Sequence, residues 1–440
     1  MFFFSAVFIM SVVSSLPSSV NYNESMFVLP EGTTNFEYVA RPVNGSNFGA
    51  SSQVIVDLGN VGYLDPASLF IRYSITYTAG AVANPKTVGT PVYTPIARLD
   101  TLVNSQTIET INLYNAVANL YTNLQLSISD KMGNPGLGFQ DGLANENTDG
   151  ANFAGIAAGG TTAVQYYSAP LLGILANADK MLPLFLMNQT RLVFTLDSAA
   201  NVCSNITAEL TSVAAFSISN FEVVYNTVVF PESVQREIMA SPKLKIKSTS
   251  YASSTAPTVP TGSSGSVSLQ YNMRYASVRS CILINGGTSA TNSANKNMDS
   301  YDLTSSNGDY QFQIAGTNYP QTPLSTLNNR GGIISELRKV MGTIFGSTVS
   351  MAISRTEFSQ VQNAPTTTVL PAKFWVGQNL MRLTTPSRSL FNGLSTQMSP
   401  INVNVSINTA TTQALNPTLV LFYDAVIEID TMTRQVTMIQ

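Results

Sequence analysis

Two segments of the chain repeat the same pattern. Residues 95–121 are predicted to form a buried strand, a polar turn at Asn104-Ser105-Gln106, a second short strand and a helix. Small hydrogen-bonding side chains favour such a turn because they bond to the local backbone. Residues 310–340 repeat the order of strand, Gly-Thr-Asn turn, polar connection and helix. Two copies of one unit predict two copies of one domain.

The helix of the first unit is predicted from residues that recur at helical spacing, and Thr110 and Asn112 are the candidate residues for its N-cap. The recurring residues are Ile111, Tyr114, Asn115, Ala118 and Tyr121.

The rest of the chain is dominated by short apolar or alternating runs separated by turn-rich connections. Such runs, with few helical patterns, are typical of β-sandwiches and barrels. A chain of 440 residues is long enough for two full domains. The strongest expected strands are residues 53–58, 68–77, 191–197, 215–229, 267–275, 280–284, 402–407 and 418–429.

The composition excludes several classes of function. Charged residues make up 11 % of the chain, against roughly 25 % in typical soluble domains. The surface is therefore either polar and uncharged or buried against other copies, as in an assembly. A net charge of -3 gives no basic footprint for nucleic acid, so no specific nucleic-acid partner is expected.

Histidine is absent and cysteine is sparse, with Cys203 and Cys281 far apart. A zinc site needs about four Cys or His ligands, and a disulfide framework needs several cysteine pairs. The sequence therefore predicts no metal site, no cofactor and no disulfide scaffold.

The first twenty residues are apolar but lack the positively charged start of a secretory signal. The run is also too short for a transmembrane span, which needs about 20 apolar residues. We interpret residues 1–20 as an uncleaved apolar arm that tucks under the folded body or touches a membrane surface.

Four motifs resemble a known family, the double jelly-roll major capsid proteins of eukaryotic DNA viruses, which include large algal, virophage-like and polinton-like viruses. RLDTLVNSQTIETINLYN at residues 98–115 is similar to the strand, turn and helix start of the family's first roll. ADKMLPLFLMNQTRLVFTLDSA at residues 178–199 resembles the family's LPL segment and the charged-apolar strand ending in FTL that follows it. FEVVYNTVVFPESVQREIM at residues 221–239 resembles the last strand of the first roll and the helix that joins the rolls. LVLFYDAVIEIDTMTRQVTMI at residues 419–439 resembles the closing strand pair of the second roll.

The resemblance implies an all-β fold of two consecutive eight-stranded jelly-roll β-sandwiches, with a few short helices in the connections. The expected divisions are an apolar arm at residues 1–20, a first roll at 21–230, a linker helix at 231–240 and a second roll at 241–440. The two connections rich in Gly and Asn, at residues 132–165 and 285–309, and the apolar start follow no pattern of the family.

The implied function is that of a structural major capsid protein, which self-assembles as pseudo-hexagonal homotrimers into an icosahedral shell. The implied partners are neighbouring capsomers, penton and minor capsid proteins, and an internal membrane reached through the arm. The implied location is the virion, and the host cell during assembly. The alternative is a secreted or cell-surface β-sandwich adhesin or lectin, favoured if residues 1–20 are a signal peptide. A minor capsid or vertex protein would use one roll and a shorter chain.

Five carboxylates are candidate acid–base partners, namely Asp57, Asp65, Asp197 and the pair Glu428 and Asp430. Glu428 and Asp430 are two residues apart and share one face of a strand. No pKa-tuning partner stands beside any of the five, so strand-face or loop-cap roles account for them better. No catalytic residue is predicted.

Nucleophilic and phosphate-binding chemistry also lack support in the sequence. A serine nucleophile needs a base, no histidine exists, and no Ser–Lys spacing suggests a substitute. The pairs Gly159-Gly160 and Gly286-Gly287 lack the Gly-Lys-Ser/Thr that follows in a phosphate loop. We therefore expect a protein that is not an enzyme.

Five Asn-X-Ser/Thr sequons occur, at Asn23, Asn44, Asn188, Asn205 and Asn404. Asn188 and Asn404 lie near expected strands, where a glycan would not fit. Asn23, Asn44 and Asn205 are therefore the candidate glycosylation sites, although a virus assembling in the cytoplasm or nucleus would leave them unused.

Connections rich in Gly, Asn, Ser and Thr are expected to form the outward-facing loops, because loops leave the sheets and tolerate variation. These are residues 133–162, 252–266 and 285–309. Residues 171–175 and 391–398 are the apolar edges expected to contact other copies in the trimer.

Overall fold

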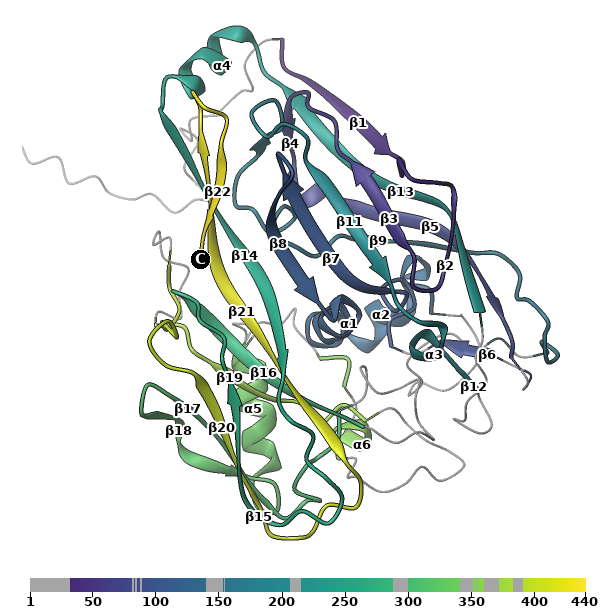
Figure 1. Ribbon diagram of the computed structural model, residues 1–440, viewed down its shortest axis with the longest axis vertical. Helices are drawn as coiled ribbons and strands as arrows, with labels where there is room; N and C mark the ends of the chain where they lie inside the picture. Colours follow the sequence, from purple (N-terminus) through teal and green to yellow (C-terminus); the bar gives the residue numbers. More distant parts are fainter. Residues whose placement is uncertain are drawn as a thin grey trace, which may run out of the picture.

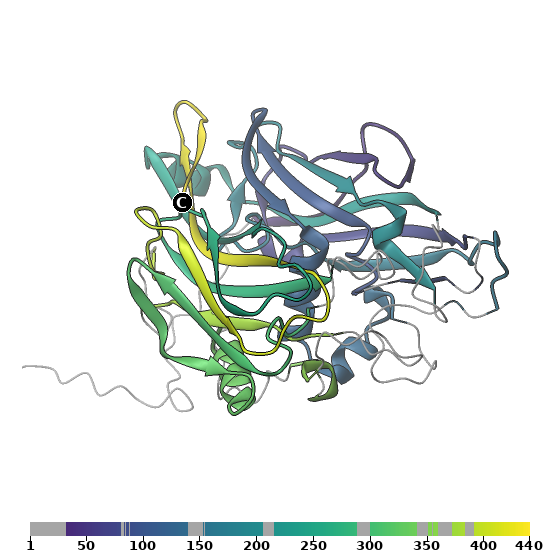
Figure 2. The ribbon, with the colours of Figure 1, turned by 60° about the horizontal axis from the view of Figure 1, so that its bottom comes forward.

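The structure is a computed structural model that describes residues 32–80, 83, 85–87, 89–139, 153, 155–205, 215–287, 300–340, 351–353, 355–359, 372–382 and 391–440. Figures 1 and 2 show two lobes side by side, one formed by the chain up to β13 and the other by the chain from β14 onward. The apolar arm at residues 1–20 lies outside the described residues.

Eight strands of the first lobe form two antiparallel rows, ordered β1-β13-β5-β9 and β3-β11-β7-β8. We call these rows the β13 sheet and the β11 sheet. Their strands are β1 (Thr34–Ala40), β3 (Gln53–Asp57), β5 (Phe70–Thr78), β7 (Ile96–Val103), β8 (Gln106–Asn112), β9 (Gln165–Pro170), β11 (Arg191–Leu196) and β13 (Ala215–Val229).

Eight strands of the second lobe form two further antiparallel rows, ordered β14-β21-β16-β19 and β15-β20-β17-β18. We call these the β21 sheet and the β20 sheet. Their strands are β14 (Lys243–Thr255), β15 (Gly265–Tyr271), β16 (Val278–Gly287), β17 (Gly308–Ile314), β18 (Thr317–Ser325), β19 (Val376–Asn379), β20 (Ile401–Ile407) and β21 (Leu415–Asp430).

The strand order is the same in both lobes. Numbered along the chain, the first, eighth, third and sixth strands form one row of each lobe, and the second, seventh, fourth and fifth form the other. Two facing four-stranded sheets of this kind make a jelly roll. The expected fold class, two consecutive eight-stranded jelly rolls, is confirmed.

Several short strands add to the β13 and β21 sheets. Strand β2 pairs with β13, β4 pairs with both β13 and β10, and β22 pairs with β21. Strands β6 and β12 pair with each other in a separate two-stranded sheet. Their bounds are β2 (Asn47–Gly49), β4 (Tyr63–Leu64), β6 (Pro85–Thr87), β10 (Leu182–Pro183), β12 (Cys203–Asn205) and β22 (Val436–Ile439).

The repeated unit seen in the sequence is a β-hairpin followed by a helix in both lobes. The hairpin β7–β8 turns at Asn104 and Ser105 and leads to α1 (Tyr114–Gln125). The hairpin β17–β18 turns at Ala315 and Gly316 and leads to α5 (Arg330–Val340). All four turn residues have positive φ, which matches the twist of two-residue hairpins.

Details of the unit differ from the sequence expectation. Gln106 already belongs to β8, and the second turn lies one residue before the expected Gly-Thr-Asn. Thr110 and Asn112 do not cap α1, because β8 runs on to Asn112 and Leu113 then turns the chain with φ 51°. Helix α1 therefore begins without a side-chain cap at its N-cap position.

The remaining helices are short and lie in connections, as expected. α4 joins the two lobes within the region predicted as a linker helix. The bounds are α2 (Ile128–Met132), α3 (Ala199–Val202), α4 (Glu232–Met239), α6 (Arg355–Phe358), and the 3-10 turns η2 (Pro66–Ser68) and η3 (Pro135–Leu137).

Buried apolar residues form one continuous cluster across both lobes. Strand β13 alternates between buried and half-buried positions because its sheet is covered mainly on one face. Strand β21 is buried at nearly every position from Leu415 to Ile427. Its almost continuous apolar sequence is typical of a strand covered on both faces.

The two ends of the molecule differ. Figure 1 shows α4, the turn between β21 and β22, and the start of β1 at one end. The connection from β14 to β15 and the helices α2, α3 and α6 lie toward the other end.

Parts of the loop and contact predictions are wrong. β14 continues to Thr255 and β15 begins at Gly265, so the expected loop at residues 252–266 shrinks to 256–264. Residues 300–304 are buried rather than exposed, because Tyr301 and Leu303 join the core and Asp302 bonds its surroundings. The segment 171–175 is not a free edge, since its leucines and isoleucine are 0–5 % exposed within this single chain.

Candidate functional site at the seam between the two lobes

Two of the carboxylates weighed for acid–base chemistry lie in cross-strand ion pairs. Asp57 on β3 accepts two hydrogen bonds from Arg191 on β11, at 2.5 and 2.9 Å, and these lower the pKa of Asp57. Glu428 on β21 accepts a hydrogen bond of 2.7 Å from Lys243 and lies 3.5 Å from Lys245. The bond from Lys243 lowers the pKa of Glu428. Both carboxylates therefore link paired strands, Asp57 joining β3 to β11 and Glu428 joining β21 to β14.

Two more of these carboxylates cap turns. Asp65 accepts a bond of 3.2 Å from the amide of Ala67 and starts η2. Asp430 accepts bonds of 2.9 and 2.8 Å from the amides of Met432 and Thr433 in the turn before β22. The bond from the Thr433 amide lowers the pKa of Asp430. The structure does not bring the five carboxylates together, and the described residues contain no group of three metal-ligating side chains.

The sequons occupy different settings. Asn44 is exposed, and its amide donates to and accepts from the backbone of β3 at 2.7 and 3.0 Å. Asn205 ends the short strand β12, and Asn23 lies outside the described residues. Asn188 is half-buried, and so is Asn404, which lies on β20. Glycosylation of Asn23, Asn44 and Asn205 stays a prediction.

Strand β14 runs along the contact between the lobes, and further hydrogen bonds join Ala352 to Asn123 and Asn104 to Arg434. Strand β14 pairs with β21 in its own sheet, while serine and backbone groups along β14 hydrogen bond to the first lobe. We define the seam as Glu109, Ile174, Asn177, Ser248 and Ser250. It joins β8 and the connection after β9 in the first lobe to β14 in the second.

Glu109 is the ionisable group at the centre of the seam. It is 2 % exposed and accepts bonds from the amide of Ile174 at 2.9 and 3.0 Å. Thr101 Oγ1 donates to it at 3.3 Å, and Ser250 of the second lobe also donates to it. Burial raises the pKa of Glu109 to about 7, against the opposing effect of these bonds. Removing water favours the neutral form of a carboxyl group that has no cation beside it.

Further hydrogen bonds fasten the seam on both sides of Glu109. Ser248 donates to the carbonyl of Ile174 at 2.6 Å, and Asn177 donates to the carbonyl of Thr249 at 2.8 Å. Asn177 also donates to the hydroxyl of Tyr251 at 3.1 Å. Since these groups are polar and mostly buried, each bond also avoids the cost of an unsatisfied group.

A cleft of about 240 Å³ opens beside the seam, between α1 and the β21 sheet. Polar and apolar side chains both line it, and both lobes contribute to it. Its lining residues are Tyr121, Gln125, Asn177, Thr249, Tyr251, Arg279, Ser280, Val340 and Phe422.

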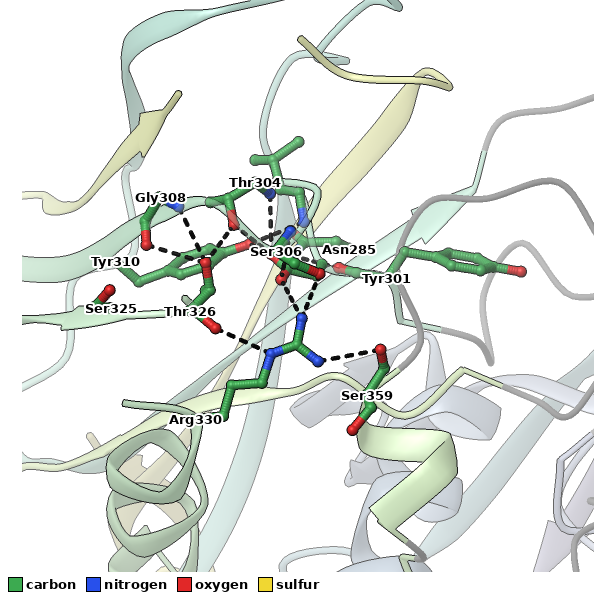
Figure 3. Close-up of polar contacts among 12 residues, drawn as sticks. Asn285, Tyr301, Thr304, Ser306, Gly308, Tyr310, Ser325, Thr326, Arg330 and Ser359 are labelled. Carbon is green, nitrogen blue, oxygen red and sulfur yellow. Dashed lines mark hydrogen bonds and ion pairs between the residues drawn. The ribbon is translucent and has the colours of Figure 1, made fainter. Parts of the chain in front are cut away.

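A second buried polar cluster ties the hairpin–helix unit of the second lobe together (Figure 3). Asp302 is fully buried and accepts bonds from the amide of Thr304 at 3.0 Å and from the hydroxyl of Tyr310 at 3.2 Å. Arg330, the first residue of α5, lies 3.4 Å from Asp302 and donates to the carbonyl of Ser359 at 3.1 Å. Burial raises the pKa of Asp302, while its hydrogen bonds and Arg330 oppose that rise.

The first lobe has a comparable contact at the same place in its unit. Asn115, in the first turn of α1, donates to Asp197 at 2.7 Å. Asp197 also accepts a bond of 2.8 Å from Asn201. In each lobe, a mostly buried aspartate therefore anchors the start of the helix that follows the hairpin. Asp197 is thus a structural carboxylate, like the other four weighed from the sequence.

The sequence reading missed Glu109 and Asp302 as the important buried acids. Glu109 follows the buried Ile108 directly, so simple alternation places it on the opposite, polar face of β8. It is buried because the second lobe covers that face, and no local pattern carries this information. Asp302 lies in a polar stretch that composition alone marks as a loop.

Comparisons with known proteins rest on the fold. No model of a known protein family matches the sequence, and no curated protein matches it. The described fold matches the Faustovirus major capsid protein with a TM-score of 0.60 and 8 % identity, over 92 % of this chain and 92 % of that chain. It matches VP54 of PBCV-1, fitted into a reconstruction of the virophage Sputnik, with a TM-score of 0.58 and 12 % identity, over 93 % and 98 %.

The chain has the double jelly-roll fold of viral major capsid proteins. The mavirus major capsid protein also matches, with a TM-score of 0.51 and 10 % identity, over 96 % of this chain and 94 % of that chain. Each match includes both jelly rolls, because each spans nearly the whole of both chains. At these identities the likeness lies in the fold and not in the sequence.

Proposed function

We propose that this double jelly-roll protein is the major capsid protein of an icosahedral DNA virus and assembles as a homotrimer. The observation that carries the proposal is the repetition of one eight-stranded order in two lobes of a single chain. Solved structures named as major capsid proteins of Faustovirus and mavirus share that architecture over nearly their full length.

The geometry suits a pseudo-hexagonal building block. Three copies of a two-roll chain around a threefold axis place six similar rolls in a ring. Closed cyclic symmetry satisfies each exposed interface with an identical copy. The low charge of the chain, 11 %, also fits broad contacts between copies, because interface cores are depleted of charged residues.

The proposed domain division follows the sequence expectation: a first roll at residues 21–230, a linker at 231–240 and a second roll at 241–440. It is supported by the strand pairing, since the described strands up to β13 pair among themselves and those from β14 onward do the same. The apolar arm at residues 1–20 precedes the first roll.

We place the arm on the inner side of the shell and the glycine-rich connections on the outer side. Strand β1 starts at the same end of the molecule as α4, opposite the connection from β14 to β15 (Figure 1). In this orientation the arm meets neighbouring subunits or an internal membrane. No helix among the described residues is long and apolar enough to cross a membrane.

The proposed partners are two further copies in the trimer, neighbouring capsomers, and penton and minor capsid proteins. The proposed location is the virion, and the host cell during assembly. Of the two apolar edges expected to contact other copies, residues 391–398 keep exposed groups: Phe391 is 36 % exposed and Met398 is 93 % exposed. We propose this segment as part of the contact between subunits.

A structural role also matches the chemistry of the described carboxylates, which support strands, cap turns or anchor helices. We propose that the protein acts without catalysis, cofactor or specific nucleic-acid contact.

Native mass spectrometry of the recombinant protein tests the proposal. The expected result is a trimer that persists on dilution and dissociates only under denaturing conditions. A Met398→Asp variant should weaken the trimer, and Met432→Asp, a change at another highly exposed methionine, serves as the control. A chain that stays monomeric at every concentration would contradict the proposal.

A further inference from the structure

An apolar groove opens where α4 bridges the two lobes. It has a volume of about 350 Å³ and lies between β4 and β10 of the first lobe and the start of β14 in the second. Its lining residues are Tyr63, Lys180, Met181, Pro183, Phe230, Ile238, Lys243, Leu244, Lys245 and Ile246.

The described chain leaves this groove incompletely covered. No residue of α4 is fully buried, although Ile238 points its apolar side chain into the lining. Met181 in the lining is 38 % exposed, and Met239 beside Ile238 is 42 % exposed. An apolar concavity with exposed large side chains at its rim marks an interaction site.

The N-terminal end of the described chain lies at the rim of the groove. Thr34 on β1 pairs with Val229 on β13, and the strands are antiparallel. Residues before Thr34 therefore run in the direction of Phe230, which follows Val229 and lines the groove. The register of the sheet therefore directs the start of β1 toward the rim of the groove.

We propose that residues 26–29, the apolar run Met-Phe-Val-Leu, dock in this groove of their own chain. The five residues from Thr34 back to Leu29 can span about 17 Å. This run is the first apolar segment upstream of the sheet, and only Pro30 and Glu31 separate it from Gly32. The tether is thus short enough to hold the run near the groove at high effective concentration.

Size and charge agree with this occupant. About 150 Å³ suffices to hold a benzene-sized group, so the groove has room for about two large side chains. If the run binds in an extended conformation, Phe27 and Leu29, which are two residues apart, would point to the same side. Glu24 and Glu31 flank the run, and the described lining holds three lysines, of which Lys243 and Lys245 also pair with Glu428 on β21.

Docking would join three elements, because the run would contact α4, the first roll and the start of β14 together. It would stiffen the connection between the rolls. Within the described chain this connection is the helix α4, which has no fully buried residue. This role concerns a single chain and does not depend on trimer formation.

Cross-linking tests the proposal in the full chain. A Phe27→Cys/Ile238→Cys variant is made with Cys203→Ser, while the buried Cys281 is retained. A short bismaleimide should join positions 27 and 238 within one chain, as identified by peptide mass spectrometry. The control variant, Ser5→Cys/Ile238→Cys, places the cysteine in the apolar arm and should react at least ten times more slowly.

Two outcomes of this experiment would overturn the proposal. Equal rates for the two variants would mean that residues 26–29 are no closer to the groove than the rest of the arm. A link formed mainly between chains would assign the groove to a neighbouring copy. Because intramolecular linking does not require a trimer, its failure is distinguishable from failure of the capsid proposal.

Hydrogen exchange provides an independent readout. Phe27→Asp should increase amide exchange in α4 and at residues 243–246 several-fold, whereas Phe3→Asp, in the arm, should leave both unchanged. Unchanged exchange in Phe27→Asp would also overturn the proposal.

Discussion

Glu109 shows how a single buried carboxyl couples the two jelly rolls. It accepts hydrogen bonds from the first lobe through Ile174 and Thr101 and from the second through Ser250. The titratable groups that interact with Glu109 are the hydroxyls of Tyr114, Tyr251 and Tyr423. Burial raises the pKa of all three tyrosines. Among the described residues, no cation pairs with Glu109. Burial without a paired cation therefore favours the neutral form of Glu109.

This environment predicts a pH dependence of stability. The pKa of Glu109 is about 7 in the folded chain against 4.5 in the unfolded chain. Between these values the folded chain keeps a proton that the unfolded chain releases. The stabilisation is thus complete below pH 4.5 and is lost as the pH rises through 7, by at most about 3 kcal/mol.

The Glu109→Gln variant should remove this dependence. Glutamine keeps a neutral, hydrogen-bonding side chain, so the loss of unfolding free energy between about pH 5 and pH 8 should be smaller than in the natural chain. Urea unfolding at both pH values measures the difference. Glu237→Gln on the exposed face of α4 should behave like the natural chain. A variant and natural chain with the same pH slope would show that Glu109 titrates near its ordinary pKa.

At the scale of elements, the hairpin–helix unit was readable from the sequence because its signals are local. The alternation of apolar and polar residues predicts strand β7, and the polar pair Asn104-Ser105 predicts the turn after it. The sequence does not predict the N-cap of α1 correctly, because Leu113 occupies that position in a left-handed conformation. A leucine rarely adopts this conformation, so its residue type gives no signal for it. The anchoring aspartates were missed because their partners come from distant parts of the chain.

The anchor in the second lobe predicts a specific loss of stability. Arg330→Ala leaves the fully buried Asp302 without its guanidinium, and removing one partner of a buried pair costs about 3 kcal/mol. Arg330 also donates to Thr326 and Ser359, so the start of α5 should loosen. Arg338→Ala, exposed on the same helix, is the matched control and should change stability by less than about 0.5 kcal/mol.

Denaturant unfolding and hydrogen exchange in α5 measure this effect. If Arg330→Ala and Arg338→Ala are equally stable, the Asp302 cluster does not hold the hairpin–helix unit together. Asn115→Ala offers a second comparison, because it removes the equivalent bond to Asp197 in the first lobe.

At the scale of the whole molecule, the fold class and most strands followed from the sequence, while the contacts between lobes did not. β13 and β21 were visible as long alternating or apolar runs. The apolar run at residues 171–175 indicates an outer edge only because nothing local shows that β14 of the second lobe contacts it. The packing between domains is set by pairs of residues far apart in the chain, which a local pattern does not record.

The proposed orientation of the shell predicts where assembled protein is cut. Limited proteolysis should cleave first within residues 133–162 or 256–264, which we place on the outer side. The arm and α4 should be protected in the assembly but accessible in isolated subunits. Early cleavage at α4 or in the turn before β22 would show that the orientation is reversed. Peptide mass spectrometry of both forms provides the comparison.

The central claim is that one chain supplies two equivalent rolls to a trimeric capsid building block. Cryo-electron microscopy of the purified assembly tests it most directly. We predict three copies around a threefold axis, six rolls in a pseudo-hexagonal ring, and the glycine-rich connections on the outer face. A monomer, an open chain of subunits, or a ring in which only one roll of each copy takes part would contradict it.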